Sequence, residues 1–556
     1  MTAATPAGRG AGAAGTARKR IGPVDLAAAL GLPRPTPEQA AVIAAPLAPA
    51  VVVAGAGSGK TETMSARVVW LVANGHVRPE EVLGLTFTNK AATELGSRIR
   101  ARLAALARHG LAAPAEDEPT VLTYHAYAAR LVAEHALRLA VEPTARLLTE
   151  ALCWQLAARV VRGFDGDLPH LDRAESTVIG YVLDLAAELA EHLVAAPDLA
   201  AWTARFVERA EGLPPGPHYP RPGAKVREIL DAAQARCELL PLVQRYERAK
   251  REATAMDFGD QMSLAARIAE RFAEVGRGER ARYPVVLLDE YQDTGHSQLV
   301  LLRSLFGGTG ARGAGRGRGA GEGRGHPVTA VGDPCQSIYG WRGATAGNLV
   351  RFPRHFPAAD GTPAAVLPLS TSFRNDRRIL DAANAVSEPL RRQGVEVGVL
   401  TPGPAAGDGT VRAALLDTVD DEAAWLAAAV AEVWKADTPR RGGTGRDTRN
   451  RAAEPGARGR GGQRGRPARD ARLVRRGDPR AARTPVQRLG VGWHLLHGRR
   501  LSALRCLYGA VVGDATARRG RSRFGLQCRL WVWGPLCRDN AHVARVHRRK
   551  AAGRRA

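Results

Sequence analysis

The stretch AVVVAGAGSGKT, residues 50–61, constrains the fold more than any other part of the chain. An apolar, β-branched run ends there in a glycine-rich turn, and a helical pattern begins at Lys60. Such a turn points backbone N–H groups at an anion, and the N-terminus of the following helix adds partial positive charge. The expected phosphate-binding residues are Ala54, Gly55, Ala56, Gly57, Ser58, Gly59, Lys60 and Thr61, although the strict pattern has glycine at the first position. We expect Lys60 to reach the β- and γ-phosphates, and the Thr61 hydroxyl to bind Mg²⁺.

A second stretch, PVVLLDEYQD, supplies the carboxylates that a nucleotide-hydrolysing P-loop needs. Its apolar run ends in the adjacent residues Asp289 and Glu290. We expect Asp289 to hold Mg²⁺ through water, and Glu290 to orient or deprotonate the water that attacks the phosphate. The sequence therefore predicts ATP and Mg²⁺ as cofactors.

The order of apolar runs along the chain predicts an α/β fold. Five short runs have the composition of buried strands in a mostly parallel sheet: residues 50–55, 82–87, 284–289, 328–333 and 365–370. Helical patterns over 60–75 and 89–110 separate the first of them. Between about residues 126 and 255 the strand signals vanish, and Ala/Leu-rich segments with charged opposite faces predict an all-helical insertion.

The positive charge of the chain is concentrated at its C-terminal end. Residues 437–556 hold 31 of the 80 Lys and Arg residues but only 7 of the 55 Asp and Glu residues. We expect an Arg/Gly-rich, low-complexity tail there, which is either an arm that binds nucleic-acid phosphates or the out-of-frame product of a frameshift in a GC-rich gene. Translating the other two reading frames downstream of codon 436 separates these alternatives. A low-complexity loop is expected over 307–326, and a disordered leader over 1–22.

Cysteine spacing and hydropathy narrow the class of protein further. The six cysteines include no CxxC pair, which argues against a zinc site and a disulfide framework. No apolar run reaches the length of a membrane span. We therefore expect a cytoplasmic protein without a membrane partner.

Six motifs in one order indicate a family. They are AGAGSGKT, LTFTNKAATELGSRI, TYHAYAARL, DFGDQM, LLDEYQDTGHSQ and AVGDPCQSIYGWRGA. The series resembles the N-terminal motifs of superfamily 1 DNA helicases of the UvrD/Rep type, over about residues 33 to 436. The resemblance implies two RecA-like domains with ATP between them, each carrying a helical insertion, and 3′-to-5′ movement on single-stranded DNA. It also implies duplex junctions and repair proteins as partners. The expected domains are a first RecA-like ATPase domain over 23–350, an incomplete second one over 351–436 and the tail.

The resemblance assigns further roles residue by residue. Gln39 matches the glutamine that reads adenine, Gln336 the sensor of the γ-phosphate, and Arg374 the arginine finger. Phe373 stands where a tyrosine often stacks on adenine. Single-stranded DNA is expected to stack on aromatic side chains that follow strands. The residues expected at the DNA are Phe87, Asn89, Tyr124, His125, Tyr339, Trp341 and Arg342.

Beyond the fourth motif the resemblance becomes incomplete. Residues 411–437 predict a strand and then an amphipathic helix, as expected inside the second domain, and the later motifs are not recognisable in the tail. We therefore expect an ATP-dependent DNA helicase or translocase that is truncated in its second motor domain, binds nucleotide weakly and unwinds poorly. The alternatives are a catalytically inactive nucleic-acid-binding fragment and the motor subunit of a nuclease-linked repair complex. ATP hydrolysis stimulated by single strands, compared with Lys60→Ala, separates a motor from a binding protein.

Overall fold

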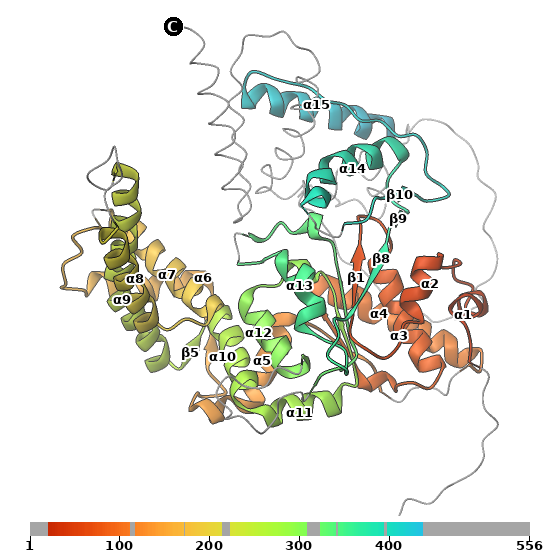
Figure 1. Ribbon diagram of the computed structural model, residues 1–556, viewed down its shortest axis with the longest axis horizontal. Helices are drawn as coiled ribbons and strands as arrows, with labels where there is room; N and C mark the ends of the chain where they lie inside the picture. Colours follow the sequence, from red (N-terminus) through yellow and green to blue (C-terminus); the bar gives the residue numbers. More distant parts are fainter. Residues whose placement is uncertain are drawn as a thin grey trace, which may run out of the picture. The chain divides into compact units, whose positions relative to one another are not determined.

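The computed structural model divides the chain into two compact units (Figure 1). It describes residues 20–111, 117–171, 173–213, 223–307, 323–340, 343–393 and 397–437. The first unit takes in the described residues up to Ser372 and those of 387–400, and the second takes in 373–386 and the described residues from 401 onward. Most of the expected leader, the low-complexity loop and the basic tail lie outside the described residues.

A six-stranded, fully parallel sheet organises the first unit. Its strands are β1 (Ala50–Ala54), β2 (Val82–Thr86), β3 (Thr120–Thr123), β6 (Val285–Leu288), β7 (Val328–Gly332) and β8 (Ala365–Leu369). They lie in the order β3-β2-β6-β7-β1-β8. The five apolar runs expected as strands all form strands. The four inner strands are covered on both faces, which requires nearly continuous apolar sequence, whereas β8 lies partly exposed at an edge. The sixth strand, β3, lies at an edge and was not expected.

Helices cover both faces of this sheet. One face carries α2 (Pro37–Ile43), α3 (Lys60–Ala73) and α4 (Asn89–Arg108), with α1 (Pro23–Ala29) packed outside α3 and α4. The other face carries α5 (Tyr124–His135), α10 (Phe258–Arg271), α11 (Ala273–Arg282), α12 (His296–Phe306) and α13 (Gly347–His355). Successive residues of a strand point to opposite faces. Val51 of β1 accordingly joins the core under α5 and α12, and Val52 joins the core under α3 and α4.

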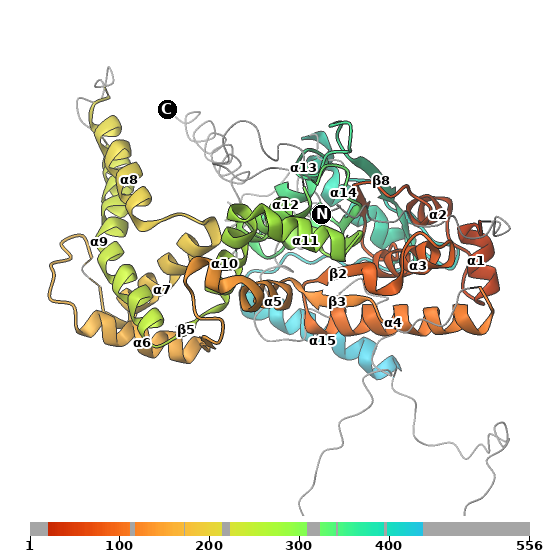
Figure 2. The same cartoon turned by 90° about the horizontal axis from the view of Figure 1, so that it is seen from below.

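A separate helical cluster belongs to the same unit. Its helices are α6 (Glu150–Arg162), α7 (Glu175–His192), α8 (Ala196–Glu211) and α9 (Ala224–Glu252). Figures 1 and 2 show them gathered at one end of this unit, beside the sheet and its covering helices. Their core includes Leu156, Ile179 and Val243. At its base the short strands β4 (Arg146–Leu147) and β5 (Ala255–Met256) pair in parallel.

Two expected features of the first α/β unit need correction. The segment expected as an all-helical insertion, 126–255, begins inside α5, whose residues Tyr127 and Leu131 are buried in the core of the sheet; it also includes β4 and part of β5. The expected domain boundary at residue 350 is too early, because β8 pairs with β1 over five residues and so belongs to the first sheet.

The remaining elements include β9 (Thr371–Ser372), β10 (Thr401–Pro402), α14 (Arg377–Arg392) and α15 (Val419–Asp437). The described residues also form the 3₁₀ turns η1 (Pro79–Glu81), η2 (Ala136–Leu139), η3 (Tyr291–Asp293) and η4 (Pro334–Gln336). The expected helix near the end of the described chain is α15, but the strand expected before it is wrong: residues 411–416 have no strand structure. Val411 and Leu415 there are exposed, so the run lacks the covered face that stabilises a strand. None of the described helices is long and apolar enough to span a membrane.

Candidate nucleotide site and nucleic-acid interface

The loop between β1 and α3 has the backbone of a phosphate cradle. Gly57 and Gly59 adopt φ angles of 79° and 80°, a left-handed conformation that only glycine adopts without cost. Gly59 is the residue before α3, and no side chain caps this helix end. The first N–H groups of α3, which begins at Lys60, therefore face outward without a side-chain acceptor and suit an anion.

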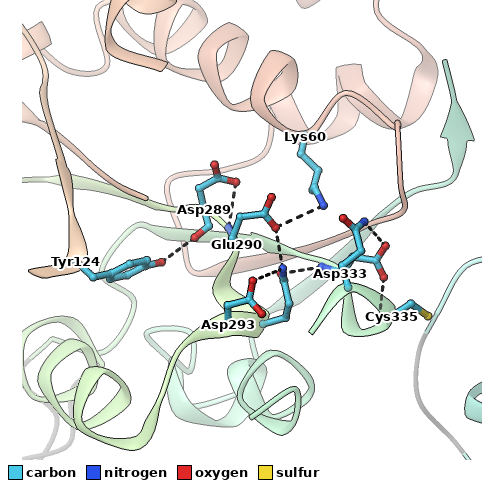
Figure 3. A network of polar contacts seen from close by, with 9 residues as sticks. Lys60, Tyr124, Asp289, Glu290, Asp293, Asp333 and Cys335 are labelled. Carbon is cyan, nitrogen blue, oxygen red and sulfur yellow. Dashed lines mark hydrogen bonds and ion pairs between the residues drawn. The ribbon is translucent and has the colours of Figure 1, made fainter. Parts of the chain in front are cut away.

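Lys60 lies next to the carboxylate expected to act as base. Its Nζ is 3.6 Å from Glu290 Oε2, and its side chain is 12% exposed. Figure 3 draws this ion pair as a dashed line. The Nζ atom is buried and makes no hydrogen bond within the described structure. A buried ammonium group is costly unless paired and hydrogen-bonded. Lys60 thus holds a positive charge with unused donors beside the glycine-rich loop.

Asp289 is the most enclosed acidic group of the site. It is 4% exposed, its N–H donates to the Leu85 carbonyl at 2.8 Å, and its Oδ1 accepts the Glu290 N–H at 3.0 Å. Burial, and then the nearby Glu290 carboxylate, raise the pKa of Asp289 to about 7, against the opposing effect of Lys60. A cation that binds beside Asp289 would therefore stabilise the charged form of its carboxylate.

Gln292 connects the loop after β6 with the loop after β7. Its Nε2 donates to Glu290 Oε2 at 2.7 Å and to Asp293 Oδ2 at 3.3 Å, and its Oε1 accepts the Asp333 N–H at 3.0 Å. Asp333 Oδ2 in turn accepts from Gln336 Nε2 at 2.6 Å. A continuous path of polar contacts thus runs from Lys60 through Glu290 and Gln292 to the main-chain N–H of Asp333, and from the Asp333 carboxylate to Gln336. Figure 3 draws these contacts as dashed lines.

Asp293 carries a second perturbed carboxylate near Glu290. Burial, followed by the charge of Glu290, raises its pKa to about 7. One of its carboxylate oxygens, Oδ1, is buried without a hydrogen-bond partner in the described part of the chain. The site therefore holds three acidic side chains, Asp289, Glu290 and Asp293, close to the single ammonium of Lys60.

Gln39 lies against the phosphate loop from α2. Its side chain is part of a capping box: Thr36 Oγ1 accepts the Gln39 N–H at 3.2 Å, and Gln39 Oε1 accepts the Thr36 N–H at 3.0 Å. The remaining amide group, Nε2, donates to the Ser58 carbonyl at 3.2 Å. The residue is 8% exposed. Its amide is thus fixed at the mouth of the loop by contacts on both sides.

Two of the residues expected to bind DNA lie together. The rings of Phe87, after β2, and Tyr339, after β7, stack with their centroids 5.0 Å apart at 27°. Asn89 is exposed at the start of α4.

His125 packs edge-on against Phe258, with centroids 5.8 Å apart. Phe258 is 54% exposed and lies in the motif DFGDQM, yet it was not expected at the site.

Tyr124 was expected to stack on DNA, and the structure corrects this expectation. It is 3% exposed, and its hydroxyl donates to the main-chain carbonyl of Asp289 at 3.0 Å (Figure 3). Burial and the charge of Asp289 raise the pKa of this phenol well above its usual value. Tyr124 is a core residue that ties α5 to the end of β6, and its ring is not open to a base.

For several expected site residues, the structure shows no contact that tests the expected role. Trp341 and Arg342 lie outside the described residues. Phe373 and Arg374 are exposed and open the second unit, so their roles toward the nucleotide stay predictions. Thr61, in the first turn of α3, is partly buried.

The donor set suits a cation shared with a phosphate ligand. Among the residues that the structure describes, no three His, Cys, Asp or Glu side chains form a metal-binding group. Mg²⁺ commonly binds through one or two protein oxygens, several waters and the substrate phosphates. The Thr61 hydroxyl and the buried Asp289 carboxylate are oxygen donors of this kind, so the residues present fit Mg²⁺.

Gln292, Asp293 and Asp333 are site residues that sequence reasoning missed. Asp333 follows β7 directly, and Gln292 and Asp293 lie in η3, the turn that follows β6. The carboxyl ends of parallel strands meet at one edge of a sheet, where ligands bind. That rule, applied to every polar residue after these two strands, would have found them.

Comparison with known proteins identifies similar sequences. The family model described as the UvrD/REP helicase N-terminal domain matches residues 35–357. The ATP-dependent DNA helicase UvrD1 of Mycobacterium tuberculosis (strain ATCC 25618 / H37Rv) is 28% identical over 352 residues, which are 63% of this chain and 38% of that protein. DNA helicase II of Escherichia coli (strain K12) is 28% identical over 63% of this chain and 40% of its own length. ATP-dependent DNA helicase PcrA of Bacillus subtilis (strain 168) is 26% identical over 61% of this chain and 37% of its own length. The chain thus spans about two fifths of the length of these relatives.

Proposed function

Because the chain belongs to the UvrD/REP helicase family, matching its N-terminal domain, we propose that it binds ATP and couples ATP hydrolysis to 3′-to-5′ movement on single-stranded DNA. The observation that carries the proposal is the buried ammonium of Lys60, which lies beside Glu290 and has unused donors. A group of this kind at the start of a helix after a glycine-rich loop suits the β- and γ-phosphates of a nucleotide.

The proposed chemistry begins with charge exchange at Lys60. When phosphate oxygens approach, Lys60 can turn its donors to them, and Glu290 loses its ion-pair partner. The freed carboxylate can then accept a proton from water that attacks the γ-phosphate. Gln292 holds Glu290 from the other side, which limits where that carboxylate can move.

Thr61 and Asp289 would hold Mg²⁺, which would supply positive charge to stabilise the phosphates during transfer. Gln39 would meet the adenine at the mouth of the loop. The roles of Phe373 and Arg374 toward the nucleotide stay predictions from the sequence. Gln336 would sense the γ-phosphate, because its amide is linked through Asp333 and Gln292 to the proposed base.

Single-stranded DNA would stack on the Phe87 and Tyr339 pair and on His125. Trp341 and Arg342, which lie outside the described residues, stay predicted DNA contacts from the sequence alone. Stacking on aromatic side chains tolerates any base sequence, as a translocating motor requires. The exposed position of Asn89 next to this surface suits a polar contact to the single-stranded DNA. Repair proteins and duplex junctions are the partners that the family suggests.

The test is ATP hydrolysis by the full chain with and without a single-stranded oligonucleotide, in parallel with Lys60→Ala. We expect hydrolysis that rises with DNA and is lost in the variant. A chain that binds single strands but hydrolyses no ATP above the Lys60→Ala background would instead be a nucleic-acid-binding protein. Unwinding of duplexes with 3′ or 5′ single-stranded tails tests the direction separately.

A further inference from the structure

Arg67 is a buried arginine that binds main-chain carbonyl groups. It lies on α3, about two turns beyond Lys60, and is 1% exposed. Its Nη1 donates to the carbonyls of Val42, Ile43 and Ala45 at 3.0, 3.1 and 2.8 Å, and its Nη2 donates to that of Pro46 at 3.0 Å. These carbonyls end α2 and continue directly after it. One guanidinium group thus binds the whole C-terminal end of a short helix.

The contact between Arg67 and the end of α2 is also favourable electrostatically. The C-terminal carbonyls of a helix carry partial negative charge and have no partner within the helix. Burial lowers the pKa of Arg67 to about 10, so the side chain is still charged at neutral pH. No carboxylate pairs with Arg67 in the part of the chain that the structure describes. The last two carbonyls of α2 and two carbonyls of the chain directly after it therefore satisfy the Nη atoms of Arg67, whereas its buried Nε has no hydrogen-bond partner in the described structure. These contacts require the end of α2 to stay in this position.

The same helix carries Gln39. With only seven residues, α2 is far shorter than a helix that is stable alone, and its two ends are held by different contacts. Thr36 and Gln39 cap its N-terminus, and Arg67 binds its C-terminus. Gln39 reaches the phosphate loop at Ser58, and a Cβ added at Gly59 would lie 2.9 Å from Gln39 Nε2. The amide of Gln39 is therefore in close contact with the loop, and its place depends on α2.

We propose that Arg67 is a positioning residue for recognition of the nucleotide base: it fixes α2 to α3 and so holds the Gln39 amide at the phosphate loop. This inference rests on the proposed binding of ATP. Phosphate binding would use the α3 amides and Lys60, which do not belong to α2. Loss of Arg67 should therefore reduce selectivity for the base while leaving affinity for the phosphates.

The test measures binding to the full chain by calorimetry in the presence of Mg²⁺, with ATP, UTP and inorganic tripolyphosphate as ligands. We expect the wild-type chain to prefer ATP over UTP. In Arg67→Lys, whose compact ammonium cannot bind four carbonyls in the same fork, the ATP affinity should fall about tenfold toward that of UTP. Tripolyphosphate affinity should change less than about twofold.

Further variants separate this role from general support of the fold. Arg102→Lys is the matched control, because Arg102 donates from α4 to Ser65 and Glu62 of α3 and forms no hydrogen bond to α2 in the described part of the chain. It should keep the base preference. Gln39→Ala should lose the preference, and adding Arg67→Lys to it should change the ATP to UTP ratio no further. Thr36→Ala loosens the opposite end of α2 and should act like Arg67→Lys. It decides the question if Arg67→Lys does not fold.

Three outcomes would overturn the role of Arg67: equal loss of ATP and tripolyphosphate affinity in Arg67→Lys, an unchanged ATP to UTP ratio, or additive effects of Gln39→Ala and Arg67→Lys on that ratio. A different result would refute the proposed function itself. In that case the wild-type chain would bind neither ATP nor tripolyphosphate more tightly than Lys60→Ala does.

Discussion

Gln292 and Asp333 join the two loops that follow β6 and β7 through one hydrogen bond, in which the Asp333 N–H donates to Gln292 Oε1 at 3.0 Å. The other end of the same amide donates to Glu290 at 2.7 Å. Gln292 is 1% exposed, so neither contact can be replaced by bulk water without opening the site. The amide therefore fixes the proposed base relative to the loop that carries Gln336.

Replacing Gln292 by Ala should uncouple these loops. We expect the ATP hydrolysis rate to fall about tenfold or more, since Glu290 loses its orienting donor, while ATP affinity changes little. The free energy of unfolding should fall by about 1–3 kcal/mol, because buried polar groups lose their partner. Steady-state hydrolysis, nucleotide titration and urea denaturation measure the three quantities.

Gln298→Ala is the control for this variant. Gln298 is also buried, and its Oε1 accepts the Gly295 N–H at 3.1 Å at the start of α12, where it does not contact Glu290. It should lose stability without a comparable loss in hydrolysis rate. Equal kinetic effects of the two substitutions would show that Gln292 acts only through general stability.

Glu290→Gln should separate binding from hydrolysis. The substitution removes the negative partner of Lys60, so its ammonium becomes free for phosphate, and the affinity for ATP should stay the same or increase. Hydrolysis should fall by about 10²–10⁴-fold, the usual contribution of a general base. Fluorescent-nucleotide binding and single-turnover hydrolysis measure both. Weakened binding like that of Lys60→Ala would contradict the assignment of Glu290 as base.

Much of the sheet and of the phosphate loop could be predicted from sequence because both depend on local patterns. Continuous apolar runs mark strands covered on both faces, and the spacing of Gly57, Gly59 and Lys60 specifies the loop directly. β3 was missed because its residues are only partly buried at the edge of the sheet, so its apolar signal is short. β8 was recognised as a strand, yet its partner β1 lies about 300 residues away, and pattern alone does not choose between domains.

The polar links of the site could not be read from the sequence in the same way. Tyr124 follows a strand like Phe87 does, and only the three-dimensional structure shows that its hydroxyl points inward to the Asp289 carbonyl. Arg67 looks like an ordinary charged residue of an amphipathic helix, and its burial depends on the end of α2 being next to it. These roles depend on side-chain direction and long-range packing. Neither of these produces a periodic pattern of residues that could be recognised in the sequence.

The imidazole of His326 should make stability depend on pH. Its Nε2 lies 3.0 Å from the Tyr283 carbonyl oxygen, and burial lowers the pKa of His326 from 6.5 to about 4. The folded protein therefore binds this proton less readily than the unfolded chain. The stabilising contribution is fully present above pH 6.5 and is lost as the pH falls toward 4.

We expect the stability advantage of the wild type over His326→Gln to shrink by about 2–3 kcal/mol between pH 7 and pH 4.5, because glutamine does not titrate. Urea denaturation of both chains at several pH values measures this difference, in which other titrating groups cancel. A constant gap for His326→Gln would mean that His326 is not held neutral by burial.

Lys250 should anchor the helical cluster to the sheet. Its Nζ, on α9, lies 2.8 Å from Asp257 and 2.6 Å from Asp260, before and within α10, and the side chain is 5% exposed. Replacing Lys250 by Met leaves two partly buried carboxylates without their cation, so unfolding should become easier by about 3–5 kcal/mol. Chemical denaturation followed by circular dichroism measures the loss. Arg245→Met, on an exposed part of the same helix, should have little effect, and a similar loss there would argue against a specific role of Lys250.

Phe87→Ala should weaken DNA binding and leave nucleotide binding intact. Removing the ring leaves Tyr339 without its stacked partner and takes away one face on which a base can stack. We expect the free energy of binding to an oligothymidylate to fall by about 1–3 kcal/mol, with ATP affinity unchanged. Fluorescence anisotropy with a labelled oligonucleotide measures the change. Trp202→Ala is the control, since Trp202 is also exposed and stacked, on Phe206 in α8 at 5.2 Å, away from the strand ends. Binding that is equally affected by both substitutions, or by neither, would remove the Phe87 and Tyr339 pair from the proposed DNA surface.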